Sequence, residues 1–384
     1  MEIPTEWLEM IITTIYKNKG SRKSLQYYRG IFLSNIAPKI FEKMIKSRAE
    51  PFVSNVNMLQ AGSRKNRSTC DNLFLLNGII DHAKYLNTQL YLSFYDYSTC
   101  FDSLWLEDSM LSLWKLGIRN ELFSLIFKLN EKVRIEVNSP HGMSGWFGRD
   151  RIVKQGSVLG SNLCSSSTGE LCDRNFSGGS NVGIVYINDL LYVDDTTDIN
   201  TNINEVIASH QQVINFAKSK RLLLNSTKCC MVIINKRTKD SIPTYIGDGE
   251  MKCVTSTKFL GDIINEKGTN TDMIDDRVKK GNSIIINCLS ICNEVTMGFH
   301  FIKSAMLLYN SVLVSTLLYN SKAWTNLTKC DITKIKTIQL KYLKRVARAA
   351  QSTTNAFVFL EFGVLPMEYM IHIRQLIFLH HIVT

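Results

Sequence analysis

The stretch LLYVDDTTDI, Leu190 to Ile199, places two adjacent aspartates, Asp194 and Asp195, inside an apolar run. Neighbouring carboxylates repel each other, and burying either one without a partner is costly, so a compensating positive charge is expected nearby. A divalent cation is one candidate for that charge. A plain turn is the other interpretation, because Asp is common at hairpin tips, where it hydrogen-bonds its own backbone.

A third aspartate ends a segment upstream that is typical of a strand. The residues QLYLSFYD, Gln89 to Asp96, predict a strand, and the two halves of the YVDD segment predict a hairpin. If the strand and the hairpin are neighbours in one sheet, Asp96, Asp194 and Asp195 converge on one point. Three carboxylates there require cations, and two Mg²⁺ ions, which take oxygen ligands, would turn them into a phosphoryl-transfer site.

The composition is typical of an ordinary globular protein, and the positive net charge favours a polyanionic partner. The 384 residues are 45% hydrophobic and 21% charged, which predicts two or three packed subdomains. The formal charge is +11, and eight Lys or Arg residues accompany the single acidic residue Asp331 between Ser321 and Ala350. The N-terminus has no signal-peptide pattern, and ten scattered cysteines without a C-x-x-C pair favour reduced thiols. We therefore expect an intracellular protein, in the nucleus or the cytoplasm.

The rest of the chain predicts a mixture of helices and strands. Helical spacing marks two segments, one with Ile36, Ile40, Met44 and Ile45 and another with Leu73, Leu76, Ile80 and Ala83. The residues Phe101–Gly117 predict one helix, with Asp102 or Ser103 as its N-cap. Further predictions are a half-buried strand at Val133, Ile135 and Val137, a helix over 203–221, strands in CCMVIIN and KFLGDII, a turn at Asp248-Gly249, and mainly helices after about residue 276.

One uncharged segment has the length of a membrane span. It runs from Ser304 to Ser321, and five polar residues interrupt it. Those interruptions favour a buried helix over a spanning one, and we expect no membrane partner.

Five segments follow one another along the chain: FYDYSTCFD, VKQGSVLGSNL, YVDD, LLLNSTK and KFLG. In this order they resemble the palm motifs of the reverse transcriptase domain of non-LTR (LINE-type) retrotransposons. YKNKGSRKSLQYYRGIFLSNIAPKIFEKMI and LQAGSRKNRSTCDNLFLL resemble its finger motifs, and YYRGI with LLYNSKAW and IRQLIFLHHI is closest to RTE-like or related groups. The resemblance implies an α+β right-hand polymerase, with fingers over 1–88, a palm over 89–268 that has some finger elements interleaved, and a helical thumb and extension over 269–384.

The resemblance also implies roles for individual residues. Asp96 and Asp194 match the direct metal ligands, Asp195 the supporting carboxylate, and the Tyr97 carbonyl a further ligand of two Mg²⁺ ions, with Mn²⁺ as the alternative. Phe101 matches the aromatic gate against a 2′-hydroxyl, and a core aromatic is its other interpretation. The other residues matched to the dNTP site are Arg64, Lys65, Arg67, Gln155, Gly156 and Lys228. Phe259, Leu260 and Gly261 match the primer-grip turn, with an edge-strand turn as the alternative.

Basic residues near the C-terminus favour nucleic acid as a partner. Lys334, Lys341, Arg345 and Arg348 recur at helical spacing in DITKIKTIQLKYLKRVARAA, which predicts salt-sensitive phosphate binding or, alternatively, a solvated helix face. The implied partners are an RNA template, a DNA primer and a dNTP. The sequence leaves the oligomeric state undefined.

Several positions depart from the family pattern. Cys100 replaces a usual alanine, Val158, Gly160 and Ser161 stand where a proline, a serine and another proline are usual, and Ala61 and Ser63 replace aromatics. The span from Gln155 to Asp194 is short, and no endonuclease domain precedes the fingers. We therefore keep two expectations, an RNA-directed DNA polymerase and a degenerate or host-captured remnant that binds nucleic acid without catalysis.

Overall fold

The computed structural model describes residues 2–18, 20–98, 100–139, 142–148, 154, 156–173, 179–182, 185–237, 244–246, 249–295 and 299–384. The chain forms two compact units. The first unit comprises Met1–Asn72, Gln89–Ile233 and Arg237–Val254, and the second comprises Leu73–Thr88, Ile234–Lys236 and Thr255–Thr384. Each unit is therefore assembled from segments that lie far apart in the sequence.

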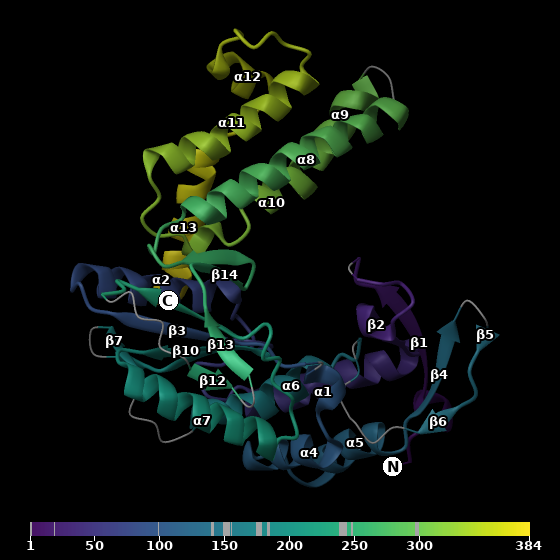
Figure 1. Ribbon diagram of the computed structural model, residues 1–384. Helices are drawn as coiled ribbons and strands as arrows, with labels where there is room; N and C mark the ends of the chain where they lie inside the picture. Colours follow the sequence, from purple (N-terminus) through teal and green to yellow (C-terminus); the bar gives the residue numbers. More distant parts are fainter. Residues whose placement is uncertain are drawn as a thin grey trace. The chain divides into compact units, whose positions relative to one another are not determined.

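The first unit contains a small mixed sheet (Figure 1). Its strands are β1 (Glu9–Tyr16), β2 (Tyr28–Leu33), β4 (Arg134–Ser139), β5 (Gly142–Met143) and β6 (Phe147–Gly148). Strand β1 pairs antiparallel with β2 and parallel with β4. Met10, Phe32, Val133 and Ile135 form the buried core against this sheet, which confirms the strand predicted from the alternation that begins at Val133.

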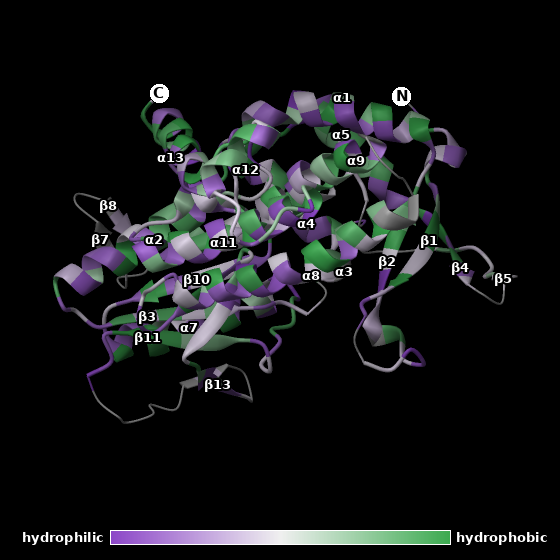
Figure 2. Cartoon of the chain, turned by 90° about the horizontal axis from the view of Figure 1, so that it is seen from above, coloured by the Kyte–Doolittle hydropathy of each residue, from purple (hydrophilic) through white to green (hydrophobic). Residues whose placement is uncertain are grey.

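The larger sheet of the first unit carries the predicted aspartates. Its strands, in spatial order, are β12 (Thr244–Ile246), β13 (Gly249–Cys253), β11 (Cys230–Ile234), β3 (Leu90–Tyr95), β10 (Asp195–Asn200) and β9 (Asp189–Tyr192). All six residues of β3 are buried, as expected for a central strand. The hydrophobic colouring of β3 and β11 is visible in Figure 2. The predicted strand after Gln89 and the predicted YVDD hairpin are therefore confirmed.

Helix α7 (Ile203–Ser219) covers one face of this sheet (Figure 1). It begins at Asn202, whose side chain accepts a hydrogen bond from the Glu205 amide. Val206 and Val213 of α7 share a buried cluster with Tyr91, Tyr95 and Met231 of the sheet. The helix predicted over 203–221 is confirmed to within two residues.

A second buried cluster holds other helices of the first unit together. These helices are α1 (Ile36–Val53), α3 (Cys100–Ser103), α4 (Leu106–Lys115), α5 (Asn120–Glu131) and α6 (Gly160–Gly169). Ile45, Leu113, Ile126 and Leu163 are among its members. Three short 3₁₀ helices (Thr5–Trp7, Leu25–Tyr27, Glu170–Asp173) and a hairpin of β7 (Ser180–Val182) and β8 (Val185–Ile187) are also present.

The single helix predicted over Phe101–Gly117 is wrong, because the chain breaks between α3 and α4. Leu104 is fully buried, and Trp105 is extended with the Arg221 guanidinium 4.5 Å from its ring centroid. These tertiary contacts outweigh the local helical preference. Asp102 and Ser103 consequently lie inside α3 and do not cap α4, which starts without a side-chain cap.

The second unit is mainly helical. Its elements are most of α2 (Thr69–Tyr85), a hairpin of β14 (Ser256–Phe259) and β15 (Asp262–Asn265), then α8 (Thr271–Val295), α9 (Phe299–Leu308), a π-helical stretch (Tyr309–Val314), α10 (Ser315–Leu317), a 3₁₀ turn (Ser321–Ala323), α11 (Lys329–Val346), α12 (Asn355–Phe362) and α13 (Met367–Val383). A buried cluster that includes Ile274, Tyr309 and Tyr342 joins α8, α9 and α11. The prediction of helices towards the C-terminus is confirmed.

One strand prediction and one turn prediction near this unit change in detail. KFLGDII forms a hairpin and not one strand, because Leu260 and Gly261 both have positive φ, 47° and 92°, and reverse the chain. The turn predicted at Asp248-Gly249 lies partly outside the described residues, and Gly249 begins β13.

The uncharged segment from Ser304 to Ser321 forms consecutive helical stretches, and Ala305, Tyr309, Leu313 and Leu317 are fully or nearly fully buried in the core of the second unit. Among the described helices, none alone has the length and apolarity to cross a membrane, although the bent pair α12 and α13 meets that criterion by length and composition.

Candidate active site

The YVDD motif forms the turn of the β9–β10 hairpin. Asp195 pairs with Tyr192 across this hairpin, so Val193 and Asp194 occupy the two-residue turn. Strand β10 also runs antiparallel to β3, with Thr196 opposite Tyr95. The next residues beyond that pair are Asp195 and Asp96, so the register brings the two carboxylates to the same end of neighbouring strands, with Asp194 beside them.

The pKa values of the hairpin aspartates show that their charges interact. Burial raises the pKa of Asp194, and the charge of Asp96 adds to this effect, while its own backbone amide and Lys228 oppose it. Desolvation, followed by the charges of Asp194 and Asp96, raises the pKa of Asp195 to about 6, although its side chain is exposed at the surface. Desolvation and the neighbouring carboxylates therefore disfavour the charged forms of Asp194 and Asp195, and Lys228 opposes this effect in part.

Lys228 supplies the compensating positive charge in this structure. Its Nζ donates a hydrogen bond to Asp96 Oδ2 at 2.6 Å, and both side chains are partly exposed. Within the described residues, no group of three His, Cys, Asp or Glu side chains is arranged to hold a metal ion. The donor chemistry of the three aspartates fits a hard divalent cation, whereas their present spacing suits the ion pair with Lys228.

The end of β3 is held by the LLLNSTK segment. The Asn225 amide donates to Asp96 O at 2.8 Å, the Ser98 amide donates to Leu223 O at 2.7 Å, and Tyr97 forms a β-bridge with Leu224. Tyr97 itself is buried. These backbone bonds fix the position of Asp96, and the role of the Tyr97 carbonyl as a metal ligand stays a prediction.

Two of the three fingertip cations, Arg64 and Arg67, bind other residues of the first unit. The Arg64 guanidinium donates to the backbone oxygens of Asn57 and Ser54, at 3.3 and 3.1 Å. Burial, followed by the charge of Arg67, lowers the pKa of Arg64. Arg67 forms an ion pair with Asp71 at 3.2 Å. Contacts of Arg64 and Arg67 with a triphosphate would therefore replace these bonds.

Lys65 has a different setting. It is exposed, and it lines a groove of about 780 Å³ together with Arg64 and with Lys43 and Lys46 of α1. Lys65 is therefore accessible from solvent, and its contact with a triphosphate stays a prediction.

The predicted gate and pocket loop are only partly described. Phe101 is half-buried in α3 and packs against the cluster of α1, α4 and α5, which agrees with the core interpretation and leaves the gate as a prediction. Gln155 lies outside the described residues. Gly156 has φ +116°, and a Cβ there would lie 2.7 Å from the Phe32 carbonyl oxygen, so the close approach that requires glycine is to β2.

The departure at Cys100 has a packing explanation. Its Sγ lies 3.7 Å from Cys164 Sγ of α6, and both side chains are buried. The hydrogen bond with Cys100, together with burial, raises the pKa of Cys164, which keeps the thiol unreactive. All ten cysteines lie in the described part of the chain, and none of them is paired in a disulfide, as predicted.

The turn predicted as a primer grip belongs to the second unit. Phe259 is buried, and the Leu260 and Gly261 carbonyls accept hydrogen bonds from Asn320 Nδ2 and Arg277 Nη2, each at 3.0 Å. Arg277 also pairs with Asp262 at 2.6 Å, with both side chains buried. The turn is therefore held rigidly from behind, and its contact with a primer stays a prediction.

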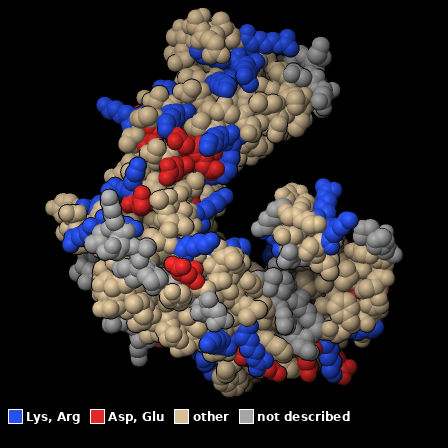
Figure 3. Space-filling view, in the orientation of Figure 1, with Lys and Arg blue, Asp and Glu red and all other residues tan. Residues whose placement is uncertain are grey.

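The basic residues of α11 do not form one free face. Lys334 Nζ donates to Asp275 Oδ1, and Lys341 Nζ donates to Asn282 Oδ1, each at 2.6 Å, so both lysines are directed toward α8. Arg345 is exposed, whereas Arg348 follows the end of α11 with φ 52° and lies over the Phe301 ring. Figure 3 shows acidic and basic side chains intermingled on these helices. Arg345 remains the member of the set with the most open position.

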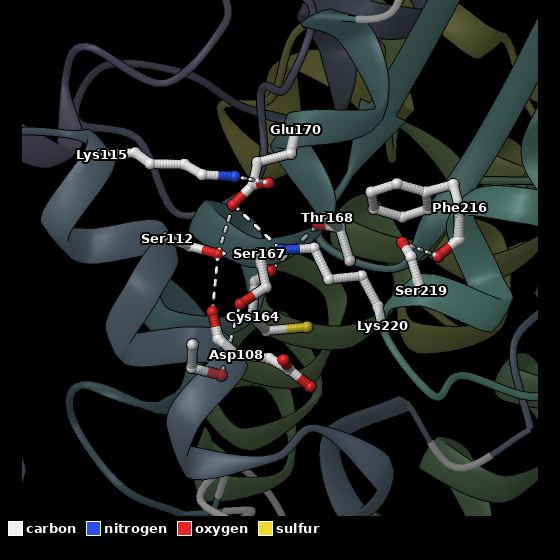
Figure 4. Close-up of polar contacts among 11 residues, drawn as sticks. Asp108, Ser112, Lys115, Cys164, Ser167, Thr168, Glu170, Phe216, Ser219 and Lys220 are labelled. Carbon is white, nitrogen blue, oxygen red and sulfur yellow. Dashed lines mark hydrogen bonds and ion pairs between the residues drawn. The ribbon is translucent and has the colours of Figure 1, made fainter.

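A partly buried polar cluster lies at the end of α6 (Figure 4). Glu170 accepts hydrogen bonds from Ser112 and from Lys115, the latter at 2.8 Å, and pairs with Lys220 at 3.0 Å. Desolvation alone would raise the pKa of Glu170, but these hydrogen bonds and the charge of Lys220 outweigh it and lower the pKa. The cluster joins α4, α6 and the end of α7.

The sequence analysis missed two residues that contact the aspartate turn. Gln60, in the LQAGSRK motif, is fully buried and bonds both backbone groups of Val193. Thr168 of α6 lies with its hydroxyl 2.6 Å from the Val193 carbonyl oxygen. The signal available in the sequence was the motif itself, in which a polar residue precedes Ala61 and Gly62.

Comparison with known proteins agrees with this arrangement. Residues 16–264 match the family described as "Reverse transcriptase (RNA-dependent DNA polymerase)". The chain is 24% identical over 340 residues to the "RNA-directed DNA polymerase from mobile element jockey" of Drosophila funebris, and 21% identical over 364 residues to that of Drosophila melanogaster. These alignments cover 84% and 90% of this chain but 36% and 38% of the relatives. The chain therefore spans little more than a third of the length of these curated relatives.

Solved structures show the same fold. Apo telomerase from Candida tropicalis matches 98% of this chain and 64% of its own, with a TM-score of 0.54 and 13% sequence identity. The same enzyme in complex with a TWJ fragment of telomeric RNA matches 93% of this chain and 64% of its own, with a TM-score of 0.50 and 12% identity. The predicted fold class, an α+β right-hand polymerase, is confirmed by the first of these likenesses. Because the family match extends over well over half of the chain, this chain belongs to the reverse transcriptase (RNA-dependent DNA polymerase) family.

Proposed function

We propose that the chain is the polymerase part of a non-LTR retrotransposon protein and extends a DNA primer with dNTPs on an RNA template. The observation that carries this proposal is the register of β3 and β10, which places Asp96 beside Asp195 with Asp194 on the adjoining turn. Family membership supports the reaction class.

Members of this family typically depend on divalent metal ions, and we propose Mg²⁺, with Mn²⁺ as the alternative. Asp96 and Asp194 would hold the ions, with Asp195 and the Tyr97 carbonyl in support, and bound metal would stabilise the charges on the attacking and leaving oxygens. The chain's own residues prepare this site. Lys228 partly neutralises Asp96, and the backbone bonds from Asn225 keep the end of β3 in place.

The nucleotide and nucleic-acid contacts belong to the same proposal. Lys65 with Arg64 and Arg67 would bind the triphosphate, Gln155 and Gly156 would shape the pocket, and Phe101 would exclude the 2′-hydroxyl. Phe259, Leu260 and Gly261 would contact the primer, and Arg345 with Lys334, Lys341 and Arg348 would contact phosphates.

The finer subdivision is also proposed. We assign fingers to 1–88, palm to 89–268 and a helical thumb with its extension to 269–384, supported by the helices that follow Thr271. The YYRGI, LLYNSKAW and IRQLIFLHHI segments favour RTE-like or related elements within the non-LTR group. An intracellular site of action, in the nucleus or the cytoplasm, follows from the proposed substrates.

A degenerate remnant that binds nucleic acid without catalysis is the second candidate. The observation that favours it is the Lys228–Asp96 ion pair, which occupies an oxygen that a metal would need.

Primer extension separates the two candidates. Wild type, Asp194→Asn and the control Asp276→Asn, which removes a partly exposed carboxylate of α8, are compared in the presence of Mg²⁺ with a DNA primer on RNA. Extension by the wild type and the control, but not by Asp194→Asn, supports the polymerase. Equal absence of extension with retained RNA binding supports the remnant.

A further inference from the structure

The aspartate turn contains a residue in an unfavourable backbone conformation. Val193 has φ 61°, in the left-handed region. A β-branched residue rarely adopts this conformation, and it persists only where surrounding contacts impose it. Val193 directly precedes Asp194, so its φ determines the direction in which the chain presents that carboxylate.

The Gln60 side chain makes the contacts that impose this conformation. Its Oε1 accepts hydrogen bonds from the Val193 and Gly62 amides, both at 2.9 Å. Its Nε2 donates to Val193 O at 3.1 Å and to Thr168 Oγ1 at 3.0 Å. The Gln60 side-chain amide thus donates two hydrogen bonds and accepts two. If this amide were flipped, its NH₂ group would face the backbone N–H groups of Val193 and Gly62. The same side chain holds both backbone groups of one residue.

The backbone around Gln60 also pairs with the hairpin and approaches it closely. The Ala61 amide donates to Leu191 O, and the Leu191 amide donates to Leu59 O, both at 2.9 Å, so this segment pairs with β9. A Cβ on Gly62 would lie 2.2 Å from the Val193 amide nitrogen. Glycine at 62 is therefore required for the close approach that lets Gln60 reach the turn.

Thr168 of α6 also contacts both Val193 and Gln60. Its hydroxyl lies 3.0 Å from Cys164 O (Figure 4). It also lies 2.6 Å from Val193 O and accepts the Gln60 Nε2 donor. The Glu170 cluster described above fixes the end of the same helix.

We propose that Gln60 is a positioning residue of the polymerase reaction, which holds Val193 in the left-handed conformation and thereby sets the direction of Asp194. This inference rests on the proposed function. Gln60 acts through the backbone of Val193, and its side-chain hydrogen bonds go to Val193, Gly62 and Thr168, none of which is among the described residues assigned to the nucleotide, so its loss affects kcat more than the KM for dNTP.

A double-mutant cycle tests the proposal. Gln60→Leu removes the hydrogen bonds but keeps the approximate volume, and Val193→Gly removes the need for them, because glycine adopts positive φ without strain. We expect Gln60→Leu to lower kcat about 100-fold with valine at 193, the scale of a small misplacement of a reacting group, and about tenfold or less with glycine at 193. An equal loss in both backgrounds would overturn the proposal.

A second measurement does not depend on activity. Hydrogen exchange of the peptide that covers residues 190–197, followed by mass spectrometry, is expected to quicken in Gln60→Leu. The control is Gln339→Leu, which removes an equally buried amide that bonds Tyr309 Oη, Leu365 O and the Met367 amide in the second unit. This control is expected to lower the unfolding temperature without changing exchange at 190–197.

The two kinds of failure are distinguishable. A wild-type chain that does not extend primers contradicts the proposed function, and the exchange experiment still decides the role of Gln60. Unchanged exchange in Gln60→Leu contradicts the present inference even in an active enzyme. If Gln60→Leu does not fold, Thr168→Val, which removes one bond to Val193 O and keeps the side-chain shape, is expected to give the same pattern with a smaller change, and its failure to do so overturns the proposal.

Discussion

Lys228 Nζ lies 2.6 Å from Asp96 Oδ2, and this ion pair joins the segment before β11 to the aspartate that ends β3. The resemblance to the family assigns Lys228 to the dNTP site. In the structure, its ammonium group is a counter-ion of Asp96, and its charge also lowers the pKa values of Asp194 and Asp195. Lysine and a metal ion would therefore compete for the same oxygen.

Replacement of Lys228 by methionine is expected to tighten the binding of Mg²⁺. An exposed ion pair is worth up to about 1 kcal/mol, so the half-saturating Mg²⁺ concentration should fall by up to about fivefold. Thermal unfolding measured against Mg²⁺ concentration checks this. Lys334→Met, which removes a comparable 2.6 Å pair with Asp275, is the control and should leave the Mg²⁺ dependence unchanged. An identical Mg²⁺ dependence in wild type and Lys228→Met would show that the ammonium does not compete.

Replacement of Phe101 by alanine tests the gate. The side chain is half-buried and packs on the core cluster, so its loss should reduce stability by a few kcal/mol as well as open the sugar pocket. We expect discrimination between dNTP and rNTP, measured as a ratio of kcat/KM values, to fall by about tenfold or more. Lower stability with unchanged discrimination would leave only the core interpretation of Phe101.

Replacement of Arg277 by methionine is expected to destabilise the second unit strongly. Burial raises the pKa of Asp262 even though Arg277 opposes this effect, so the carboxylate depends on its buried partner. Removing one member of a buried pair typically costs about 3–5 kcal/mol. Urea unfolding gives the value. Lys280→Met breaks the partly exposed pair with Asp276 and should cost no more than about 1 kcal/mol, so equal effects of the two substitutions would contradict this explanation.

Replacement of Glu170 by glutamine is expected to change the acid dependence of stability. The pKa of Glu170 lies below its ordinary value of 4.5 in the folded state. Its contribution to stability is therefore complete above the unfolded-state pKa and is lost as the pH falls through the lower folded-state value. Unfolding free energy measured from pH 6 downward should fall less steeply in Glu170→Gln than in wild type. Asp276→Asn, at a more exposed pair, should show a smaller difference, and parallel curves for wild type and Glu170→Gln would refute the expectation.

The sequence pattern alone predicted those elements whose structure depends on residues close together in the chain. The apolar run before Asp96 predicted a buried strand, and the two halves around Asp194 predicted the hairpin, because both signals depend on residues close in sequence. The meeting of the three aspartates could be predicted only on the condition that this strand and this hairpin are neighbours in one sheet. The register of β3 and β10 shows that they are, and it brings Asp96 and Asp195 to the same end of the two strands.

Other features depend on contacts between distant segments and could not be predicted locally. Nothing in the residues around Leu104 indicates a helix break, because the break results from burial and from Arg221. Helical spacing grouped Lys334 with Arg348, but it could not show that α8 faces Lys334 or that α11 ends at Val346. Strands β1 and β2 were not predicted, since their sequences carry weak alternation and the pairing of β1 with β4 is long-range.

The pairing of Gln60 with Val193 also has a consequence for how the chain acquires its catalytic geometry. The two residues are 133 positions apart. At a translation rate of roughly 5–20 residues per second, the turn leaves the ribosome about 7 to 27 seconds after the glutamine that holds it. The aspartate hairpin can form its own ladder at once, yet the final geometry of its turn must await closure of that long loop, which makes it a late event in folding.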